Sequence, residues 1–124
     1  IEVVDQKALF TGDVVRNGAL GLMESDASFK GNIAAIDWMV EKKFKHYIPG
    51  HGRAGGIEIV QAYRAYLDKL LTTVKRLYAE NLSDHEMKPA VLQAVSAYKD
   101  WAGFELVLGP HVSRAYLEVE VEAF

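Results

Sequence analysis

The sequence contains no cysteine, and this absence excludes two classes of site. Without thiols there is no disulfide framework and no thiolate metal site. Any metal ion would have to bind nitrogen and oxygen ligands, which leaves histidine, aspartate and glutamate as the candidates.

The sequence also has no excess of positive charge and no long hydrophobic run. Its 14 Lys and Arg residues against 17 Asp and Glu residues give a net charge of −3, and no basic cluster could follow a phosphate backbone. Charged residues interrupt each apolar run before it reaches the roughly 20 residues that a membrane-spanning helix needs. We therefore expect a soluble protein that binds neither nucleic acid nor a membrane.

What is present is enough for one domain with a hydrophobic core. The chain has 124 residues, half of them hydrophobic, which fits a domain of ordinary size. It starts at Ile1, inside a strand-like run and not at a methionine. We therefore expect residues 1–124 to form a single domain that lacks an upstream segment.

The N-terminal part of the sequence has the pattern of a hairpin followed by a loop. The runs at residues 1–5 and 8–12 are short and rich in Val, Ile, Phe and Thr, which predicts two strands that turn near Gln6 and Lys7. Glycines at positions 12, 18 and 21 and a polar segment interrupt the pattern, so we expect a long loop over residues 13–30.

The middle of the sequence predicts a helix and a third strand. Apolar residues recur at helical spacing over residues 29–44. Residues 45–50 are then typical of a short strand that Pro49 ends. The order strand, strand, helix, strand predicts a mixed α/β (α+β) fold in which the helix packs on a sheet.

Helices dominate the C-terminal part. Apolar periodicity predicts a long helix over residues 57–78, and Ser83 with Glu86 three residues later is typical of a capping box that begins a shorter helix. We expect Gly109-Pro110 to break the chain before a terminal helix over residues 111–124, because proline suits a first helical turn. The alternating residues 116–124 leave an edge strand as the alternative.

Two of the predicted strands end beside a side chain that can bind a metal. Asp13 follows a glycine directly after the second strand, and His51 lies between two glycines after the third. Strand ends hold such side chains in place, and glycine lets the backbone bend toward a bound ion. Carboxylate oxygen and imidazole nitrogen are both zinc ligands. The pair predicts two points of a metal site, whereas each residue alone is more typical of an ordinary turn or helix cap.

These motifs resemble the last two metal-binding motifs of the metallo-β-lactamase-fold hydrolases. The segments "LFTGD" at 9–13 and "IPGHG" at 48–52 place Asp13 and His51 38 positions apart, with an amphipathic helix between them. The likeness extends over the hairpin, the block "AAIDWMVEKKFKHYIPGHG", the following long helix and the segment "SRAYLEVE". Within the superfamily, the sequence is most similar to the glyoxalase II-like and quinoprotein-associated metallohydrolase branches.

The resemblance implies a fold and a chemistry. The fold would be the C-terminal half of an αββα sandwich, with few strands and long C-terminal helices. Asp13 would bridge two metal ions and His51 would bind the second ion; the ions would be zinc, or else iron or manganese. In this family, a metal-bound hydroxide attacks an ester, thioester, lactone or amide carbonyl of a small-molecule substrate, because the metal lowers the pKa of its bound water.

The sequence departs from the family pattern in its metal ligands. The family's His-x-His-x-Asp-His motif and a further histidine before the Gly-Asp pair are absent, and His46, His85 and His111 do not replace them by spacing. We therefore expect the C-terminal portion of a larger metallohydrolase, inactive alone, whose remaining ligands come from a missing N-terminal half or a second copy. A non-catalytic interaction module and a self-pairing half-domain are the alternatives.

Four other residues are candidates for secondary roles. Arg53 could meet an anionic substrate group or be a solvated loop residue. Thr11 could orient the carboxylate of Asp13 by a hydrogen bond or be a plain strand residue. We expect Tyr63 to pack inside the fold, and His111 could reach a loop.

Overall fold

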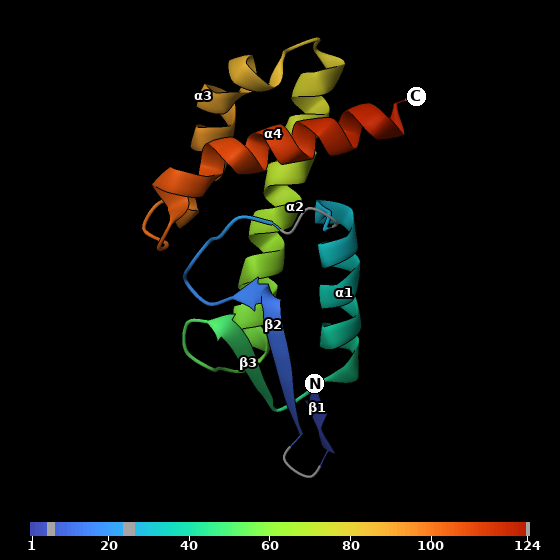
Figure 1. Ribbon diagram of the computed structural model, residues 1–124, viewed down its shortest axis with the longest axis vertical. Coiled ribbons are helices and arrows are strands. Elements are labelled where there is room, and N and C mark those ends of the chain that lie inside the picture. Colours follow the sequence, from blue (N-terminus) through green and yellow to red (C-terminus); the bar gives the residue numbers. More distant parts are fainter. Residues whose placement is uncertain (5–6, 24–26, 124) are drawn as a thin grey trace.

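A small mixed sheet lies at one end of the molecule in the computed structural model (Figure 1), which describes residues 1–4, 7–23 and 27–123. Strand β1 (Glu2–Val3) pairs antiparallel with β2 (Ala8–Arg16), and β2 pairs in parallel with β3 (His46–His51). The predicted hairpin is therefore confirmed, although Gln6 of its predicted turn lies outside the described residues.

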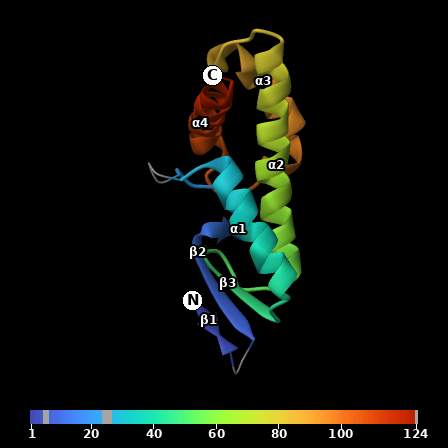
Figure 2. The same cartoon turned by 90° about the vertical axis from the view of Figure 1, so that its right-hand side faces the viewer.

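Two long helices cover one face of this sheet. Helices α1 (Phe29–Lys42) and α2 (Ile57–Ala79) run along the same side of the strands in two perpendicular views (Figure 1 and Figure 2). Their apolar faces meet Leu9 and Val15 of β2 in one hydrophobic core. Both helices were predicted, because their apolar residues recur at the spacing of one helical face.

The remaining helices pack at the other end of α2. Helix α3 (Asp84–Ala94) begins with the predicted capping box, in which the Ser83 hydroxyl accepts from the Glu86 N–H and the Glu86 carboxylate accepts from the Ser83 N–H. After the short 3-10 turn η2 (Ser96–Tyr98), helix α4 (Phe104–Glu122) crosses α2 (Figure 1). The fold is therefore mixed α/β, with a sheet end and a purely helical end.

The predicted break at Gly109-Pro110 is wrong, because α4 continues through both residues. A proline inside a helix lacks the N–H that would bond to the fourth preceding carbonyl and costs roughly 3 kcal/mol. Buried side chains on both sides of Pro110 offset that cost: Val107, Leu108, His111 and Val112. The alternative of an edge strand over residues 116–124 is also wrong, since Tyr116 to Glu122 are helical.

The strands extend further than their sequences predict. Strand β3 passes through Pro49 and ends at His51; β3 lies at the edge of the described sheet, where a missing N–H is tolerated. Strand β2 continues past Gly12, where the register with β3 shifts, as far as Arg16. Asp13 therefore lies within a strand and not in the loop that we expected.

No helix among the described residues is both long and apolar enough to cross a bilayer.

Candidate metal site and adjoining cavity

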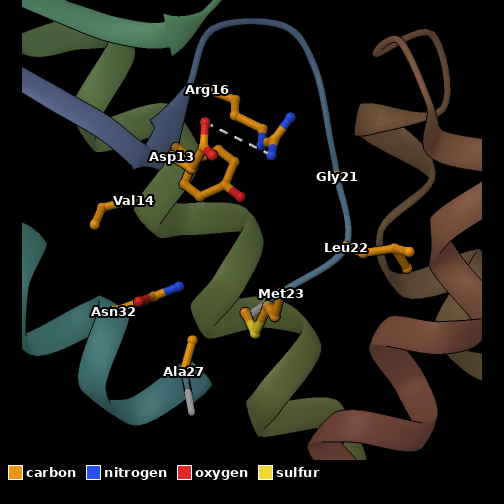
Figure 3. A pocket seen from close by; sticks show the side chains of 9 residues that line it. Asp13, Val14, Arg16, Gly21, Leu22, Met23, Ala27 and Asn32 are labelled. Atoms are coloured by element: carbon orange, nitrogen blue, oxygen red, sulfur yellow. Dashed lines mark ion pairs between the residues drawn. The ribbon is translucent and has the colours of Figure 1, made fainter. Parts of the chain in front are cut away.

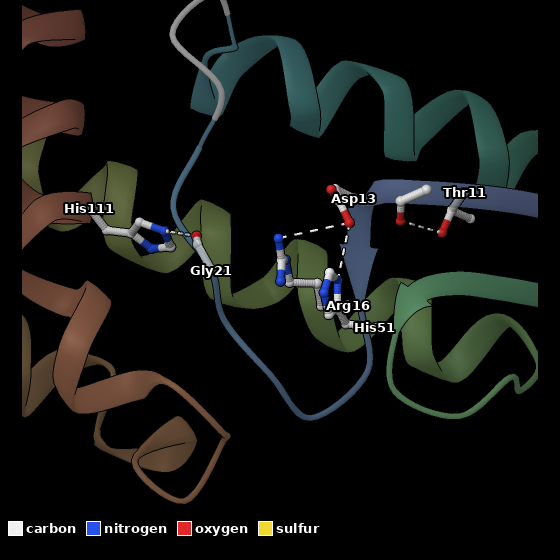
Figure 4. A network of polar contacts seen from close by, with 7 residues as sticks. Thr11, Asp13, Arg16, Gly21, His51 and His111 are labelled. Carbon is white, nitrogen blue, oxygen red and sulfur yellow. Dashed lines mark hydrogen bonds and ion pairs between the residues drawn. The ribbon is translucent and has the colours of Figure 1, made fainter.

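Asp13 and His51 lie side by side on the parallel strands β2 and β3 (Figure 4). Nδ1 of His51 is 3.1 Å from Oδ1 of Asp13, and more than half of each side chain is exposed. An ionised carboxylate only accepts hydrogen bonds, so Nδ1 carries the hydrogen and donates it to Asp13. The lone pair on Nε2 of His51 and the second carboxylate oxygen remain for other partners.

Glycines on both sides of the histidine permit this approach. A Cβ at Gly50 would lie 2.6 Å from Oδ1 of Asp13, closer than Cβ atoms come to other atoms. Gly52 has a φ of +93°, and a Cβ there would overlap the main-chain oxygen of Asn17. The N–H of Asn17 donates to the carbonyl of His51 at 3.1 Å. Larger residues at these two positions would therefore displace either the carboxylate or the loop.

The donor atoms of this pair suit zinc, but they form only part of a site. Imidazole nitrogen and carboxylate oxygen are both zinc ligands, and a zinc site uses three or four protein ligands. Residues 1–4, 7–23 and 27–123 contain no group of three or more His, Cys, Asp or Glu side chains that could hold a metal ion. Asp13 and His51 can therefore supply two ligands of a site that needs more.

In comparisons with known proteins, no protein-family model and no curated protein sequence matches the chain. The functional assignment therefore depends on the geometry of this site and on its surroundings.

A cavity of about 140 Å³ opens beside Asp13 (Figure 3). It lies between the end of β2, the following loop, α1 and α2, and it is lined by Asp13, Val14, Arg16, Gly21, Leu22, Met23, Ala27, Asn32 and Tyr63. Its lining combines charged and polar side chains with apolar ones, so the cavity can contact both a polar group and an apolar group of a small molecule.

Arg16 provides a positive charge in this cavity. Its side chain is only 14% exposed, and its guanidinium lies 3.8 Å from Oδ1 of Asp13, which is an ion-pair distance and not a hydrogen bond. The guanidinium packs against Gly21, where a Cβ would overlap it. Oδ1 of Asp13 thus contacts both the imidazole of His51 and the guanidinium of Arg16 (Figure 4).

Tyr63 packs inside the fold, as expected, but it also reaches the cavity. Its ring stacks parallel on Trp101 at a centroid separation of 6.3 Å. Burial raises the pKa of Tyr63, the positive charge of Arg16 opposes this effect and the negative charge of Asp13 adds to it. The hydroxyl therefore stays protonated and is a hydrogen-bond donor beside the charged pair.

His111 fastens the loop that forms one side of the cavity. The imidazole is 1% exposed; its Nε2 is 2.7 Å from the carbonyl oxygen of Gly21, and its Nδ1 is 2.8 Å from the hydroxyl of Tyr66. Burial raises the pKa of Tyr66, so its hydroxyl keeps the hydrogen and donates to Nδ1. His111 is then neutral, and Nε2–H donates to Gly21. This histidine reaches a loop, as its position suggested, but it lies inside the core.

The other candidate residues lie outside this cluster or contact it indirectly. The side chain of Arg53 is exposed, and its carbonyl accepts a hydrogen bond from the side-chain amide of Asn17 at 2.8 Å. The buried hydroxyl of Thr11 is 3.4 Å from the carbonyl oxygens of Gly12 and Ile48. The predicted hydrogen bond from Thr11 to the Asp13 carboxylate is absent from the contacts of the described residues.

The sequence interpretation missed Arg16, the most buried charged group at the site. Residues 13–30 were interpreted as a loop, so no face was assigned to this arginine. One signal was present: Val14 and Arg16 are two residues apart, and in a strand such residues point to the same side. Both line the cavity.

Proposed function

We propose that this chain contributes Asp13 and His51 to a dinuclear metal centre of a hydrolase that cleaves an ester, thioester, lactone or amide in a small molecule. The observation that carries the proposal is the 3.1 Å contact between the two side chains, which come from positions 38 residues apart. Two zinc ions, when bound, would supply an activated water and stabilise negative charge on the carbonyl oxygen.

The environment of the pair supports a metal role over a simple turn. A turn aspartate bonds to nearby backbone amides, whereas Asp13 faces an imidazole and a guanidinium. The glycine at position 50 leaves room for that carboxylate, and more than half of the His51 side chain is exposed. A histidine that donates Nδ1–H to a carboxylate has its other nitrogen oriented for a metal.

The fold is compatible with a half-domain of the metallo-β-lactamase type. A small sheet with helices on one face could form one layer pair of an αββα sandwich, and this proposal would place the remaining metal ligands on the other pair. The chain alone would then be inactive. Exposed apolar residues along β1 and β2 favour covering of that part of the sheet by the missing half or by a second copy: Ile1, Val4 and Phe10, which are 87%, 72% and 45% exposed.

Zinc titration of the chain by isothermal calorimetry tests this proposal. We expect zinc binding by the parent chain, and a loss of at least about tenfold in affinity for both Asp13→Ala and His51→Ala, because each removes one of two ligands. The exposed His46 offers a matched control, and His46→Ala should bind zinc as the parent does.

The location of the ion is followed by amide NMR signals during the same titration. Signals of residues 12–13 and 50–52 should shift first. Zinc binding that is equal in the parent, Asp13→Ala and His51→Ala chains would contradict the proposed site. Binding that strengthens with protein concentration, together with dimer formation, would favour the self-pairing half-domain.

A further inference from the structure

The cavity beside Asp13 and His51 holds a positive charge with unused hydrogen-bond donors. A guanidinium has five N–H donors, and within the described part of the chain Arg16 has a single charged partner, Asp13, at 3.8 Å. A charge that is largely removed from water is costly unless it is paired and hydrogen-bonded. The N–H groups of Arg16 can therefore donate hydrogen bonds to a further anionic group.

Two neutral groups surround the same space. Tyr63 is 3% exposed, and its hydroxyl has no hydrogen-bond partner among the described residues. Those residues include no fully buried side-chain nitrogen or oxygen without a partner, so this hydroxyl must be open to the cavity. The side chain of Asn32 extends from α1 toward the same space (Figure 3).

The cavity also has an apolar lining, and its volume limits the size of a ligand. The apolar residues are Val14, Leu22, Met23 and Ala27. A volume of about 140 Å³ leaves room for a few heavy atoms only. A planar carboxylate fits the fork of a guanidinium by two parallel hydrogen bonds, which a single ammonium cannot make.

We propose that this cavity binds a small carboxylate with a short apolar tail, through the guanidinium of Arg16 and the hydroxyl of Tyr63. One part of this inference rests on the proposed function: the bound carboxylate is taken to belong to the substrate of the hydrolase. Since Arg16 lies 3.8 Å from the metal-ligand candidate Asp13, the carboxylate would be next to the bond that is hydrolysed. The substrate class is then an ester, thioester or amide of a small acid that carries a second, free carboxylate.

Asp13 competes with such a ligand for Arg16. Its negative charge repels a carboxylate and partly neutralises the guanidinium. A zinc ion on Asp13 would offset that charge, so zinc should strengthen carboxylate binding. By linkage, the carboxylate should strengthen zinc binding by the same factor.

The test is an NMR titration of the 124-residue chain with butyrate, and with butyramide as its neutral counterpart. We expect butyrate to shift the side-chain Nε–H signal of Arg16 and the amide signal of Gly21, and butyramide to bind more weakly by about tenfold. Arg16→Gln should lower the affinity for butyrate by about tenfold or more, since a charged hydrogen bond is lost. Asp13→Asn should raise the affinity for butyrate, because it removes the competing negative charge. The exposed Arg76, in the last turn of α2, supplies the matched control Arg76→Gln, which should leave the affinity unchanged.

Several results would overturn the inference. They are an absence of butyrate binding, equal binding of butyrate and butyramide, or equal butyrate affinity of the parent and Arg16→Gln chains. Arg16→Lys guards against a folding defect, because it keeps the charge; it should remain folded and bind butyrate several-fold more weakly. Zinc binding that depends on Asp13 and His51 without an effect of Arg16 on butyrate would refute this inference and leave the proposed function intact. Butyrate binding through Arg16 in a chain that binds no zinc would contradict the proposed function and leave the carboxylate site intact.

Discussion

Replacement of His111 by leucine should lower the stability of the chain and remove part of its pH dependence. His111 is 1% exposed and joins the hydroxyl of Tyr66 to the carbonyl of Gly21 by bonds of 2.8 and 2.7 Å. Leucine keeps the apolar packing but removes the partner of the buried Tyr66 hydroxyl and of the half-buried Gly21 carbonyl. Each unpaired group costs about 1–3 kcal/mol, so we expect a loss of roughly 2–5 kcal/mol in the free energy of unfolding at pH 7.5.

A double-mutant cycle separates this network from general packing. Tyr66→Phe alone removes the hydroxyl and leaves Nδ1 of His111 without a donor, which should cost about 1–2 kcal/mol. Tyr66→Phe combined with His111→Leu leaves no unpaired hydroxyl, so the combined loss should be smaller than the sum by about 1 kcal/mol. Urea unfolding followed by circular dichroism measures all four free energies.

The pH dependence has a definite sign. Burial lowers the pKa of His111, and the positive charge of Arg16 adds to this effect, while the hydrogen bond to Gly21 opposes it. Below the ordinary pKa of about 6.5, the unfolded chain takes up a proton that the folded chain does not, so stability falls as the pH falls. Between pH 7.5 and 5.5, the parent should lose on the order of 1 kcal/mol more than His111→Leu. Equal pH dependence of the two chains, or additive losses in the cycle, would refute the buried neutral network.

Two further predictions concern single contacts. Gly50→Ala would place a Cβ 2.6 Å from Oδ1 of Asp13, so calorimetry should show zinc affinity about tenfold weaker; unchanged affinity would mean that the carboxylate is not a ligand in that position. Ser83→Ala removes the side-chain cap of α3, and scanning calorimetry should show about 1 kcal/mol lower stability and a Tm lower by about 4 °C. Ser83→Asp, which keeps a capping oxygen, should show little change, and equal losses in both variants would contradict the capping role.

Local patterns predicted the elements whose stability depends on local interactions. The helix that begins after Ser83 was predicted from a capping box, and both partners of that box lie within four residues. The two long helices were predicted from apolar periodicity alone, because each packs one face against the core. Asp13 and His51 were predicted to share a site from their positions at strand ends and from the family resemblance, and they lie 3.1 Å apart.

Contacts between distant segments decided the features that the sequence did not predict. Pro110 normally ends a helix, but buried neighbours on both sides keep α4 continuous. Pro49 normally ends a strand, but the edge position of β3 makes its missing N–H harmless. The role of Arg16 depends on Gly21 and Tyr63, which adjoin it only in the folded chain. The spacing of Val14 and Arg16 could indicate a shared face, but not these partners.

The loop after β2 is bound by backbone hydrogen bonds to Ala102, which lies two residues before α4. The N–H of Leu20 donates to the carbonyl of Ala102 at 2.7 Å, and the N–H of Ala102 donates to the carbonyl of Gly18 at 2.9 Å. With His111 bonded to Gly21, four consecutive residues of the loop, 18–21, have their backbone conformation fixed before any ligand arrives. A molecule that enters the cavity on this side therefore meets a preorganised wall, and the conformational entropy of that segment has already been lost in folding.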